Sequence, residues 1–423
     1  APWPRGSISE VPYIIRNLPD LMPRQTVNPN LSLLQPYPFQ KLADLLNGVQ
    51  PRAALSAINL SIGEPKHATP DFIKSAITDN LAGLANYPTT LGSEGLRMAI
   101  AAWLKNRYGL AKLDYRTQVI PVNGSREALF AFAQAAIDAT RPNPVVVCPN
   151  PFYQIYEGAA LLAGAQPQFL NTVPENGFAL DFARLADEVW ARTQLVYVCS
   201  PGNPTGRVMT LAEWQMLFEL SDRHRFVIAA DECYSEIYFD EKCPPLGALE
   251  VAARLGRENF PRLVVFGSLS KRSNVPGMRS GFVAGNAAIL ERFLLYRTYH
   301  GCAMSPPYHA ASIAAWRDEA HVTENRRLYR EKFAAVLQRL QGTLAVAMPE
   351  AAFYLWVKTP ISDTEFAQRL YRDYNVLVLP GSYLAREAHG VNPGRNFVRI
   401  ALVAPLAECL EAAERIAALM RQL

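Results

Sequence analysis

Short apolar runs alternate with amphipathic helical patterns between about residues 63 and 300. Val145–Cys148, Leu195–Val198, Phe226–Ala230 and Leu263–Phe266 are runs of this kind, rich in the residues that buried strands prefer. Between them, stretches such as Gly95–Tyr108 carry apolar residues at helical spacing. The alternation predicts a sheet with helices on its faces, which is the arrangement of an α/β domain.

The pattern changes on both sides of this region. On the N-terminal side it predicts a helix over Pro38–Leu46 and a strand over Ala57–Ile62. After about residue 300 it predicts a long helix over Thr323–Leu340, then strands over Phe353–Val357 and Phe397–Leu402, and the chain closes with a helical pattern. These later elements indicate a smaller α+β domain.

We expect four parts along the chain. Residues 1–29 form an N-terminal arm, and its first 21 residues are interpreted as mobile or artefactual because they carry prolines and charges without an apolar signal-peptide core. Residues 30–62 contribute to the small domain, residues 63–300 form the large domain, and residues 301–423 form the small C-terminal domain. A chain of 423 residues is long enough for both domains to bury a core.

The composition limits the classes of partner. The 42 basic and 38 acidic residues leave a formal net charge of +4, and no lysine or arginine block resembles a nucleic-acid footprint. Small, weakly anionic molecules fit better as partners. No apolar run is long enough to span a membrane. The six cysteines lack metal or disulfide spacing, which favours a reducing cytoplasm and no metal site.

Three of the predicted strands end in polar residues that are able to bind a ligand. Leu195–Val198 leads to Asn203, Phe226–Ala230 leads to Asp231 and Tyr234, and Leu263–Phe266 leads to Lys271. The carboxyl ends of strands in an open α/β sheet border the crevice where ligands bind, so these side chains are expected to converge. Each residue alone has an ordinary explanation as a surface charge, a turn or a cap, and the hypothesis depends on the ordered set.

A fourth candidate is the start of a helix. Gly124–Glu127 precedes the helix-forming run Ala128–Ala139, and Ser125 is the expected N-cap. The free backbone NH groups and positive dipole end of such a helix bind phosphate readily. A plain capping serine is the alternative.

Together these residues resemble the ordered motifs of a known family. Ser-Pro-Gly-Asn-Pro-Thr-Gly at 200–206, Asp231–Tyr234, Ser268–Lys271 with Arg279, and Arg399 are similar to the motifs of class I/II pyridoxal-phosphate aminotransferases of fold type I. The resemblance extends from about residue 30 over nearly the whole chain. It implies a large domain with a mostly parallel mixed sheet flanked by helices, a smaller α+β domain, and ping-pong amino transfer between an amino acid and a 2-oxo acid.

The resemblance also implies the catalytic roles. Lys271 would hold pyridoxal 5′-phosphate as a Schiff base and then move a proton, which requires an amine with a lowered pKa. Asp231 would pair with the pyridinium nitrogen and keep it protonated. Asn203 and Tyr234 would donate to the phenolic oxygen of the cofactor.

The remaining cofactor contacts follow from the same resemblance. The ring of Tyr153 would stack on the cofactor, and its neighbour Phe152 would do so if the register is off by one. The phosphate would be bound by Arg279, whose planar fork suits two oxygens, and by residues at the helix start and the lysine motif. These phosphate ligands are Ser125, Arg126, Ser268, Ser270 and Arg279.

Substrate contacts and assembly are implied as well. Arg399, which lies in an apolar strand, would clamp the substrate α-carboxylate with help from Asn203 and the backbone NH of Gly63. Tyr87 matches the tyrosine that reaches the phosphate of a neighbouring subunit. The resemblance therefore implies a homodimer with shared active sites.

Within the family, the finer resemblance is to bacterial N-succinyldiaminopimelate aminotransferases of lysine biosynthesis, with 2-oxoglutarate as acceptor. It is carried by Pro36–Leu42, Gly63–His67, Ser270–Arg279 and Pro380–Glu387. Such a substrate has distant carboxylates, so the open end of the site should present cations. The candidates, among which the sequence does not choose, are Lys66, Arg272, Arg297 and Arg386.

Other functions remain open. An aspartate-, alanine- or kynurenine-type aminotransferase would share the same machinery with a different pocket. A pyridoxal-phosphate-binding transcriptional regulator would keep the fold, but the chain has no added helix-turn-helix domain or basic stripe. A nicotinamide-dependent oxidoreductase is disfavoured because no Gly-x-Gly-x-x-Gly turn follows a strand.

Overall fold

The computed structural model describes residues 27–423, so the predicted mobile arm of residues 1–21 lies outside the described residues. The chain divides into two units, residues 1–35 and 36–423. The described part of the first unit holds one short 3₁₀ helix, η1 (Pro29–Leu33). It begins at Asn28, whose side chain accepts a hydrogen bond from the backbone of Asn30.

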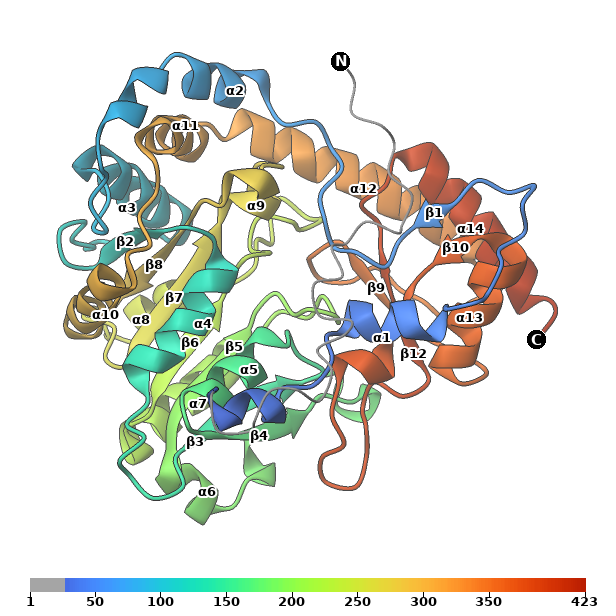
Figure 1. Ribbon diagram of the computed structural model, residues 1–423, viewed down its shortest axis with the longest axis horizontal. Helices are drawn as coiled ribbons and strands as arrows, with labels where there is room; N and C mark the ends of the chain where they lie inside the picture. The colour runs from blue at the N-terminus through green and yellow to red at the C-terminus, as the bar shows by residue number, and fades with distance from the viewer. Residues whose placement is uncertain (1–26) are drawn as a thin grey trace. The chain divides into compact units, whose positions relative to one another are not determined.

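The second unit contains a seven-stranded sheet (Figure 1). Strand β8 runs antiparallel to its neighbours β2 and β7, and all other neighbouring pairs are parallel. The predicted large, mostly parallel mixed sheet is therefore confirmed. In sheet order the strands are β2 (Val119–Val122), β8 (Gly281–Gly285), β7 (Leu263–Ser268), β6 (Val227–Asp231), β5 (Thr193–Cys199), β3 (Val145–Asn150) and β4 (Gln166–Asn171).

Helices cover both faces of this sheet because its inner strands carry buried apolar side chains on both faces. Val145 and Val147 of β3 belong to one core, whereas Val146 and Cys148 belong to the other, as the two-residue period of a strand requires. Helices α4 (Ser125–Ala136), α5 (Ile155–Leu162) and α10 (Ala287–His300) pack on the second core. The first core takes α2 (Asp71–Thr78), α3 (Glu94–Tyr108), α6 (Asp187–Arg192), α7 (Leu211–His224), α8 (Ala248–Arg254) and α11 (Pro306–Arg317).

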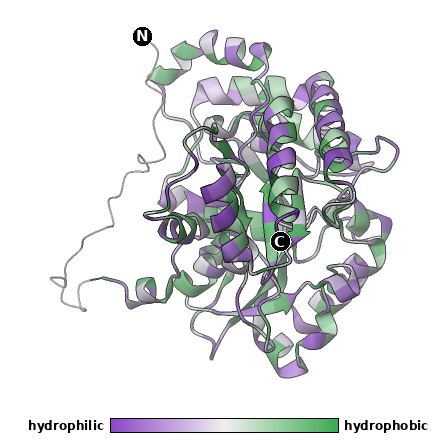
Figure 2. Ribbon diagram, turned by 90° about the vertical axis from the view of Figure 1, so that its right-hand side faces the viewer, coloured by the Kyte–Doolittle hydropathy of each residue, from purple (hydrophilic) through white to green (hydrophobic). Residues whose placement is uncertain are grey.

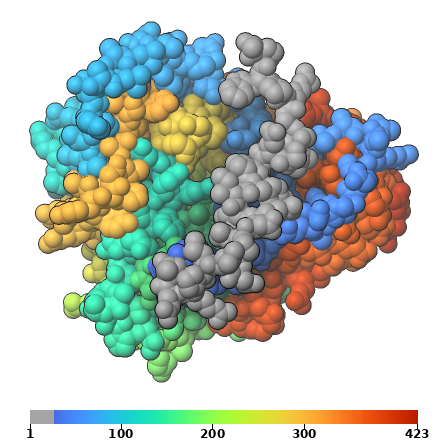
Figure 3. Space-filling model, in the orientation of Figure 1, coloured from blue at the N-terminus to red at the C-terminus, as the bar shows by residue number. Residues whose placement is uncertain are grey.

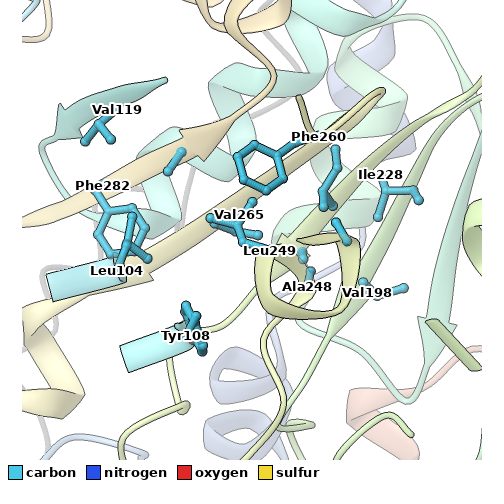
Figure 4. Close-up of a cluster of buried hydrophobic side chains, with 14 of the residues drawn as sticks. Leu104, Tyr108, Val119, Val198, Ile228, Ala248, Leu249, Phe260, Val265 and Phe282 are labelled. Carbon is cyan, nitrogen blue, oxygen red and sulfur yellow. The ribbon is translucent and has the colours of Figure 1, made fainter. Parts of the chain in front are cut away.

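Figure 4 shows the first core at close range. Val198, Ile228 and Val265 come from the neighbouring strands β5, β6 and β7, and they meet Leu249 of α8. Tyr108 closes the cluster from the end of α3. Each of these side chains is at least nine-tenths buried, so the strands that carry the site rest on a dry support.

A second group of strands and helices follows the large sheet. Its central strand β12 (Phe397–Ala401) pairs antiparallel with β9 (Tyr354–Lys358) and β11 (Leu379–Pro380), and β10 (Val376–Leu377) pairs parallel with β1 (Ile58–Asn59). The helices here are α1 (Pro38–Leu45), α12 (Ala320–Leu340), α13 (Asp363–Tyr374) and α14 (Leu406–Met420). The short α9 (Leu269–Arg272) and the 3₁₀ turns η2 (Leu81–Ala85), η3 (Pro174–Asn176), η4 (Phe182–Arg184), η5 (Pro276–Met278) and η6 (Gly381–Leu384) complete the chain.

The segment before residue 63 lies against the C-terminal elements. Arg52 donates its backbone NH to Arg372 (3.0 Å) and Ile58 does so to Asn375 (3.0 Å), and Figure 3 shows this blue stretch beside orange chain. At the other boundary, α11 packs in the core of the seven-stranded sheet. The domain limits at residues 63 and 300 stay a prediction, and the shared core favours a later second limit, after α11.

Local signals in the sequence set the helix ends. Helix α3 begins at Ser93, whose hydroxyl accepts from the backbone of Leu96 (3.3 Å), and ends at Gly109 in the left-handed region (φ 60°). Helix α7 has a capping box, in which Thr210 and Glu213 exchange side-chain and backbone bonds. Figure 2 shows green and purple residues mixed along the helices, as amphipathic packing requires. None of the helices that the structure describes is long and apolar enough to cross a membrane.

Three predicted boundaries were wrong. Ser125 is the first residue of α4 rather than its cap, because Gly124 holds the non-helical position (φ 92°). The helix also ends at Ala136, where Ile137 turns to extended geometry, and not at residue 139. The strand expected over residues 57–62 is reduced to β1, because only Ile58 and Asn59 have ladder partners in β10.

Candidate active site

A cavity of about 350 Å³ lies where β5, β6 and β7 end. Its wall contains every predicted site residue except Tyr87. The strand-end argument explains this, because Asn203, Asp231 and Lys271 follow three adjacent strands of the sheet. The predicted residues in the wall are Gly63, Ser125, Arg126, Tyr153, Asn203, Asp231, Tyr234, Ser268, Ser270, Lys271, Arg279 and Arg399.

Lys271 presents its amine to this cavity from the short helix α9. Its Nζ donates a hydrogen bond to the backbone oxygen of Gly63 (2.7 Å). Burial disfavours the ammonium form and lowers the pKa of Lys271 to about 8. At pH 7 roughly a tenth of the amine is then neutral, several hundred times more than for an ordinary lysine. The amine is therefore suited to nucleophilic attack and proton transfer.

Asp231 is a buried carboxylate at the end of β6. Oδ2 accepts a hydrogen bond from the hydroxyl of Tyr156 (2.7 Å), and Oδ1 accepts one from the backbone NH of Cys233 (3.2 Å). Tyr156 is itself stacked on Tyr197, with ring centroids 4.7 Å apart. Burial raises the pKa of Asp231. No ion pair of the described residues includes Asp231, so a cationic ligand group would offset its desolvation.

Arg399 is the corresponding buried cation. It donates to Asn203 Oδ1 (2.9 Å) and to the backbone oxygen of Ser61 (2.8 Å), and its guanidinium lies 4.5 Å from the ring centroid of Tyr354. Its Nε is buried without a hydrogen-bond partner among the described residues, and no described carboxylate pairs with it. This donor set suits an incoming carboxylate.

Tyr354 explains why residue 63 is a glycine. A Cβ at Gly63 would lie 2.0 Å from the hydroxyl oxygen of Tyr354, and that hydroxyl is hydrogen-bonded to the hydroxyl of Tyr234 (2.8 Å). The absent side chain thus lets the backbone approach the cavity wall closely. Sequence reasoning missed Tyr354, although it lies on the strand next to Arg399 and diagonally across from it.

The third region of the wall collects phosphate-binding groups. Ser125 is the first residue of the 12-residue helix α4, and Ser268 and Ser270 lie beside it in the wall. Arg279 joins them, donating to Glu127 (2.7 Å) and to the backbone of Pro276 (3.0 Å). A helix N-terminus with hydroxyl and guanidinium donors suits a phosphate.

The aromatic position is also resolved. Tyr153 lines the cavity, and its hydroxyl accepts a hydrogen bond from Arg126 Nε (2.5 Å). Phe152 is buried instead, with its ring 5.1 Å from that of Phe169. The structure therefore favours Tyr153 over Phe152 as the ring beside a ligand.

Other predicted positions lie outside the wall of the cavity. Tyr87 is fully exposed. Arg272 is buried, pairs with Glu319 and lies over the ring of Trp316, and Arg297 donates to backbone oxygens. Arg386 pairs with Glu157 (2.6 Å), and Lys66 pairs with Glu64 (2.6 Å). Because these four cations already have partners within the chain, none of them is free in this structure to bind a distal carboxylate.

Several wall residues had escaped the sequence analysis as site residues. Cys199 and Cys233 were not among the predicted site residues, yet both lie in the wall together with Asp231. Their positions at the ends of β5 and β6 were the available signal. Tyr37 and Glu64 also line the cavity, but no local pattern distinguishes them from other residues of their segments.

A mostly parallel sheet that brings a buried lysine and a buried carboxylate to the ends of adjacent strands, beside a phosphate-binding helix start, defines a fold-type I enzyme that uses pyridoxal phosphate. The family model for aminotransferase class I and II matches residues 56–416, and the chain belongs to this family. The predicted family, fold class and cofactor are thereby confirmed.

Known relatives agree over nearly the full length. An LL-diaminopimelate aminotransferase of Nitratidesulfovibrio vulgaris is 32% identical over 395 residues, which cover 92% of this chain and 98% of the relative. The crystal structure of an aminotransferase from Neisseria meningitidis is 51% identical, with a TM-score of 0.91, and the match covers 93% of this chain and 100% of that chain. A probable N-succinyldiaminopimelate aminotransferase from Thermus thermophilus is 26% identical, with a TM-score of 0.80 and coverage of 90% and 99%.

The donor set fits the cofactor. When bound, pyridoxal phosphate supplies an electron sink for negative charge that develops at the substrate α-carbon. Asp231 would hold the ring nitrogen, and the groups at the start of α4 would hold the phosphate. Arg399 would orient the substrate by its carboxylate, and the lowered pKa of Lys271 suits this amine to moving the α-proton. These individual roles stay predictions.

We expect Gly63→Ala to raise the KM of the amino donor about 10-fold or more, because overpacking against Tyr354 costs about 1–3 kcal/mol and displaces the segment beside Arg399. Steady-state kinetics measure this change. The absorbance of the bound cofactor should remain, since the groups predicted to hold its ring and phosphate, Asp231 and the start of α4, are unchanged. Gly277→Ala is the control, because nothing lies within 4 Å of a Cβ there. An unchanged KM in Gly63→Ala would contradict the prediction.

We expect Tyr156→Phe to weaken cofactor binding about 10-fold, because a buried carboxylate loses a hydrogen bond worth about 1–3 kcal/mol. The lost donor should raise the pKa of Asp231 further, so the defect should grow as the pH falls. Absorbance titration of the cofactor-free protein at several pH values measures this effect. Tyr115→Phe, on the exposed side chain that donates to Glu94, is the matched control. Equal affinities for Tyr156→Phe and the wild type would refute the role.

Proposed function

We propose that this aminotransferase transfers an amino group between N-succinyl-LL-2,6-diaminopimelate and 2-oxoglutarate in lysine biosynthesis. The observation that carries the proposal is the presence of two cations in one cavity wall, Arg399 and Arg126, neither of which pairs with a described carboxylate. Arg399 suits the α-carboxylate at the reacting end. Arg126 suits a distal carboxylate, and its competing assignment is the predicted contact with the cofactor phosphate.

The surroundings of Arg126 support a specificity role. Its Nε donates to Tyr153, its guanidinium lies 5.8 Å from the centroid of that ring, and Tyr37 lies in the same wall. The hydrogen-bond partner of Arg126 is a neutral phenol, and Glu127, which pairs with Arg279, acts on the guanidinium only from beyond ion-pair distance, so a substrate carboxylate can still pair with it. The probable N-succinyldiaminopimelate aminotransferase among the structural neighbours supports this substrate.

LL-diaminopimelate itself is the second candidate. The relative from Nitratidesulfovibrio vulgaris reported above carries that name. The two substrates differ at the distal nitrogen, which is an ammonium in LL-diaminopimelate and an amide with an added carboxylate in the succinyl form. Glu64 and Glu127 in the cavity wall would favour the ammonium, but Lys66 and Arg279 already pair with them, whereas Arg126 favours the added carboxylate.

A coupled assay with five amino donors decides between these functions. We expect N-succinyl-LL-2,6-diaminopimelate to give the highest kcat/KM, ahead of LL-diaminopimelate, N-acetylornithine, aspartate and alanine. Arg126→Gln should raise the KM for the succinyl substrate about 10-fold, because the distal carboxylate loses a charge-assisted hydrogen bond to an exposed guanidinium. The same variant should leave alanine nearly unaffected. A higher kcat/KM for LL-diaminopimelate would overturn the substrate, and equal losses for all donors together with weaker cofactor binding would assign Arg126 to the phosphate.

The proposal includes a homodimer with shared active sites. Tyr87 is fully exposed, although a tyrosine side chain has much apolar surface to bury. Other large apolar side chains near it in the sequence or on α10 are exposed by half or more of their area, which favours a covered face in the assembled enzyme. These are Leu84, Leu295 and Tyr299.

Complementation tests the shared site. Lys271→Ala and Tyr87→Ala should each be nearly inactive alone. Co-expression of both chains should restore about a quarter of the wild-type activity, because half of the dimers are mixed and each mixed dimer has one intact site. Tags of two kinds allow the mixed species to be purified. A mixed dimer without activity would contradict shared sites, and a monomer in gel filtration would contradict the dimer.

A further inference from the structure

The segment 60–69 connects the two ends of the candidate site. Leu60 accepts a backbone hydrogen bond from Ala401 (2.8 Å), and Ser61 accepts one from Arg399 (2.8 Å). Two residues after Ser61, Gly63 accepts the hydrogen bond from the amine of Lys271 (2.7 Å). The position of this segment therefore affects both the arginine that suits the substrate carboxylate and the reactive lysine.

His67 anchors the segment on the other side. Its Nδ1 lies 2.7 Å from Asn325 Oδ1, and its Nε2 lies 2.9 Å from Lys332 Nζ. The imidazole also packs on Tyr329, with ring centroids 4.5 Å apart. Asn325, Tyr329 and Lys332 all belong to α12, so one helix face holds the histidine.

Donor chemistry gives this chain of hydrogen bonds a single direction. A lysine ammonium only donates, so Nε2 of His67 accepts from Lys332 and must be unprotonated. Nδ1 then carries the proton and donates to Asn325 Oδ1. The amide nitrogen of Asn325 donates to the backbone oxygen of Lys271 (3.4 Å). These hydrogen bonds, called the relay below, lead from the buried ammonium of Lys332 through His67 and Asn325 to the backbone of Lys271.

The ammonium of Lys332 is costly to bury. The side chain is 2% exposed, and no described carboxylate pairs with it. Its remaining contacts are the backbone oxygen of Val403 (3.4 Å) and the ring of Tyr329, and Cys409 is its titratable neighbour on α14. Burial lowers the pKa of Lys332 to about 8 and lowers that of His67, so near neutral pH the lysine stays largely charged and the imidazole neutral, as the relay requires. An apolar residue would fill this place at lower cost, which indicates a role beyond packing.

We propose that Lys332, His67 and Asn325 are positioning residues for the aminotransfer reaction, which hold segment 60–69 and the backbone of Lys271 in register. Asn274 extends the same arrangement, because its side chain donates to Asn325 Oδ1 (3.2 Å) and its backbone oxygen accepts from Thr69 (2.7 Å). The inference depends on the family assignment and on no particular amino donor.

The test compares His67→Leu with His67→Gln. Leucine fills the space without hydrogen bonds, whereas glutamine keeps one acceptor for Lys332 and one donor for Asn325. In cofactor-free protein, the reaction of Lys271 with trinitrobenzenesulfonate is followed against pH and located by peptide mapping. His67→Leu should shift the midpoint upward by about half to one pH unit, because a displaced segment admits water to the amine. His67→Gln should restore the wild-type midpoint.

A kinetic readout accompanies this measurement on the loaded enzyme. With L-glutamate as the probe, His67→Leu should raise KM about 10-fold while kcat changes less than about 3-fold, since Arg399 loses its register more than the chemistry loses its groups. Lys332→Met and Lys332→Arg repeat the comparison from the other end of the relay if His67→Leu does not fold. Lys74→Met, on an exposed lysine of α2, is the control.

Two results would overturn the proposal. One is a folded His67→Leu or Lys332→Met protein with the wild-type Lys271 midpoint. The other is equal impairment of His67→Leu and His67→Gln with equal losses of thermal stability, which would show a packing role only. A shifted midpoint that glutamine restores supports positioning even if L-glutamate is a poor donor, so failure of the proposed substrate is distinguishable from failure of the relay.

Discussion

The burial of charges without opposite charges constrains the whole site. Asp231 and Arg399 are each 4% exposed, and no ion pair of the described residues includes either side chain. Neutral donors and acceptors satisfy them only in part, which leaves the Nε of Arg399 without a partner. Removing such groups from water lowers the free energy of unfolding. A bound ligand with opposite charges would offset this cost. The lowered pKa of Lys271 arises from the same dryness.

Rigid neighbours keep these groups in place. The hydroxyl of Tyr156 holds one oxygen of Asp231, and stacking on Tyr197 fixes the tyrosine. Tyr354 supports the other end, since it contacts the guanidinium of Arg399 and occupies the space that a side chain at Gly63 would need. Tyr156 lies on α5, which packs against the seven-stranded sheet, whereas Tyr354 lies on β9. The geometry of the site therefore depends on how the seven-stranded sheet and the strands β9 and β12 are held together by segment 60–69.

Strand-end residues were predictable, whereas their supports were not. Asn203, Asp231 and Lys271 follow apolar runs whose period and length are visible in the sequence, and parallel strands must bring such ends together. Tyr156 and Tyr354 act through contacts with residues about 75 and 45 positions away, which no local pattern encodes. The error at the start of α4 has a separate cause. The sequence does not reveal that Gly124 takes a positive φ, and this conformation moves the cap by one residue.

The segments that resemble N-succinyldiaminopimelate aminotransferases were expected to supply cations for the distal carboxylates of the substrate, but their arginines have another role. Arg272 is buried over Trp316 and Arg386 is paired with Glu157, so neither faces the cavity. These two arginines of the segments therefore stabilise the packing of the fold. Recognition of a substrate carboxylate then requires a cation that no carboxylate of the protein already pairs with. Arg126 is such a group, because its hydrogen-bond partner is a neutral phenol and no carboxylate of the described residues lies within ion-pair distance, although Glu127 acts on it from farther away. The proposed recognition of a distal carboxylate therefore rests on a residue of the cavity wall and not on the segments that carry the finer resemblance.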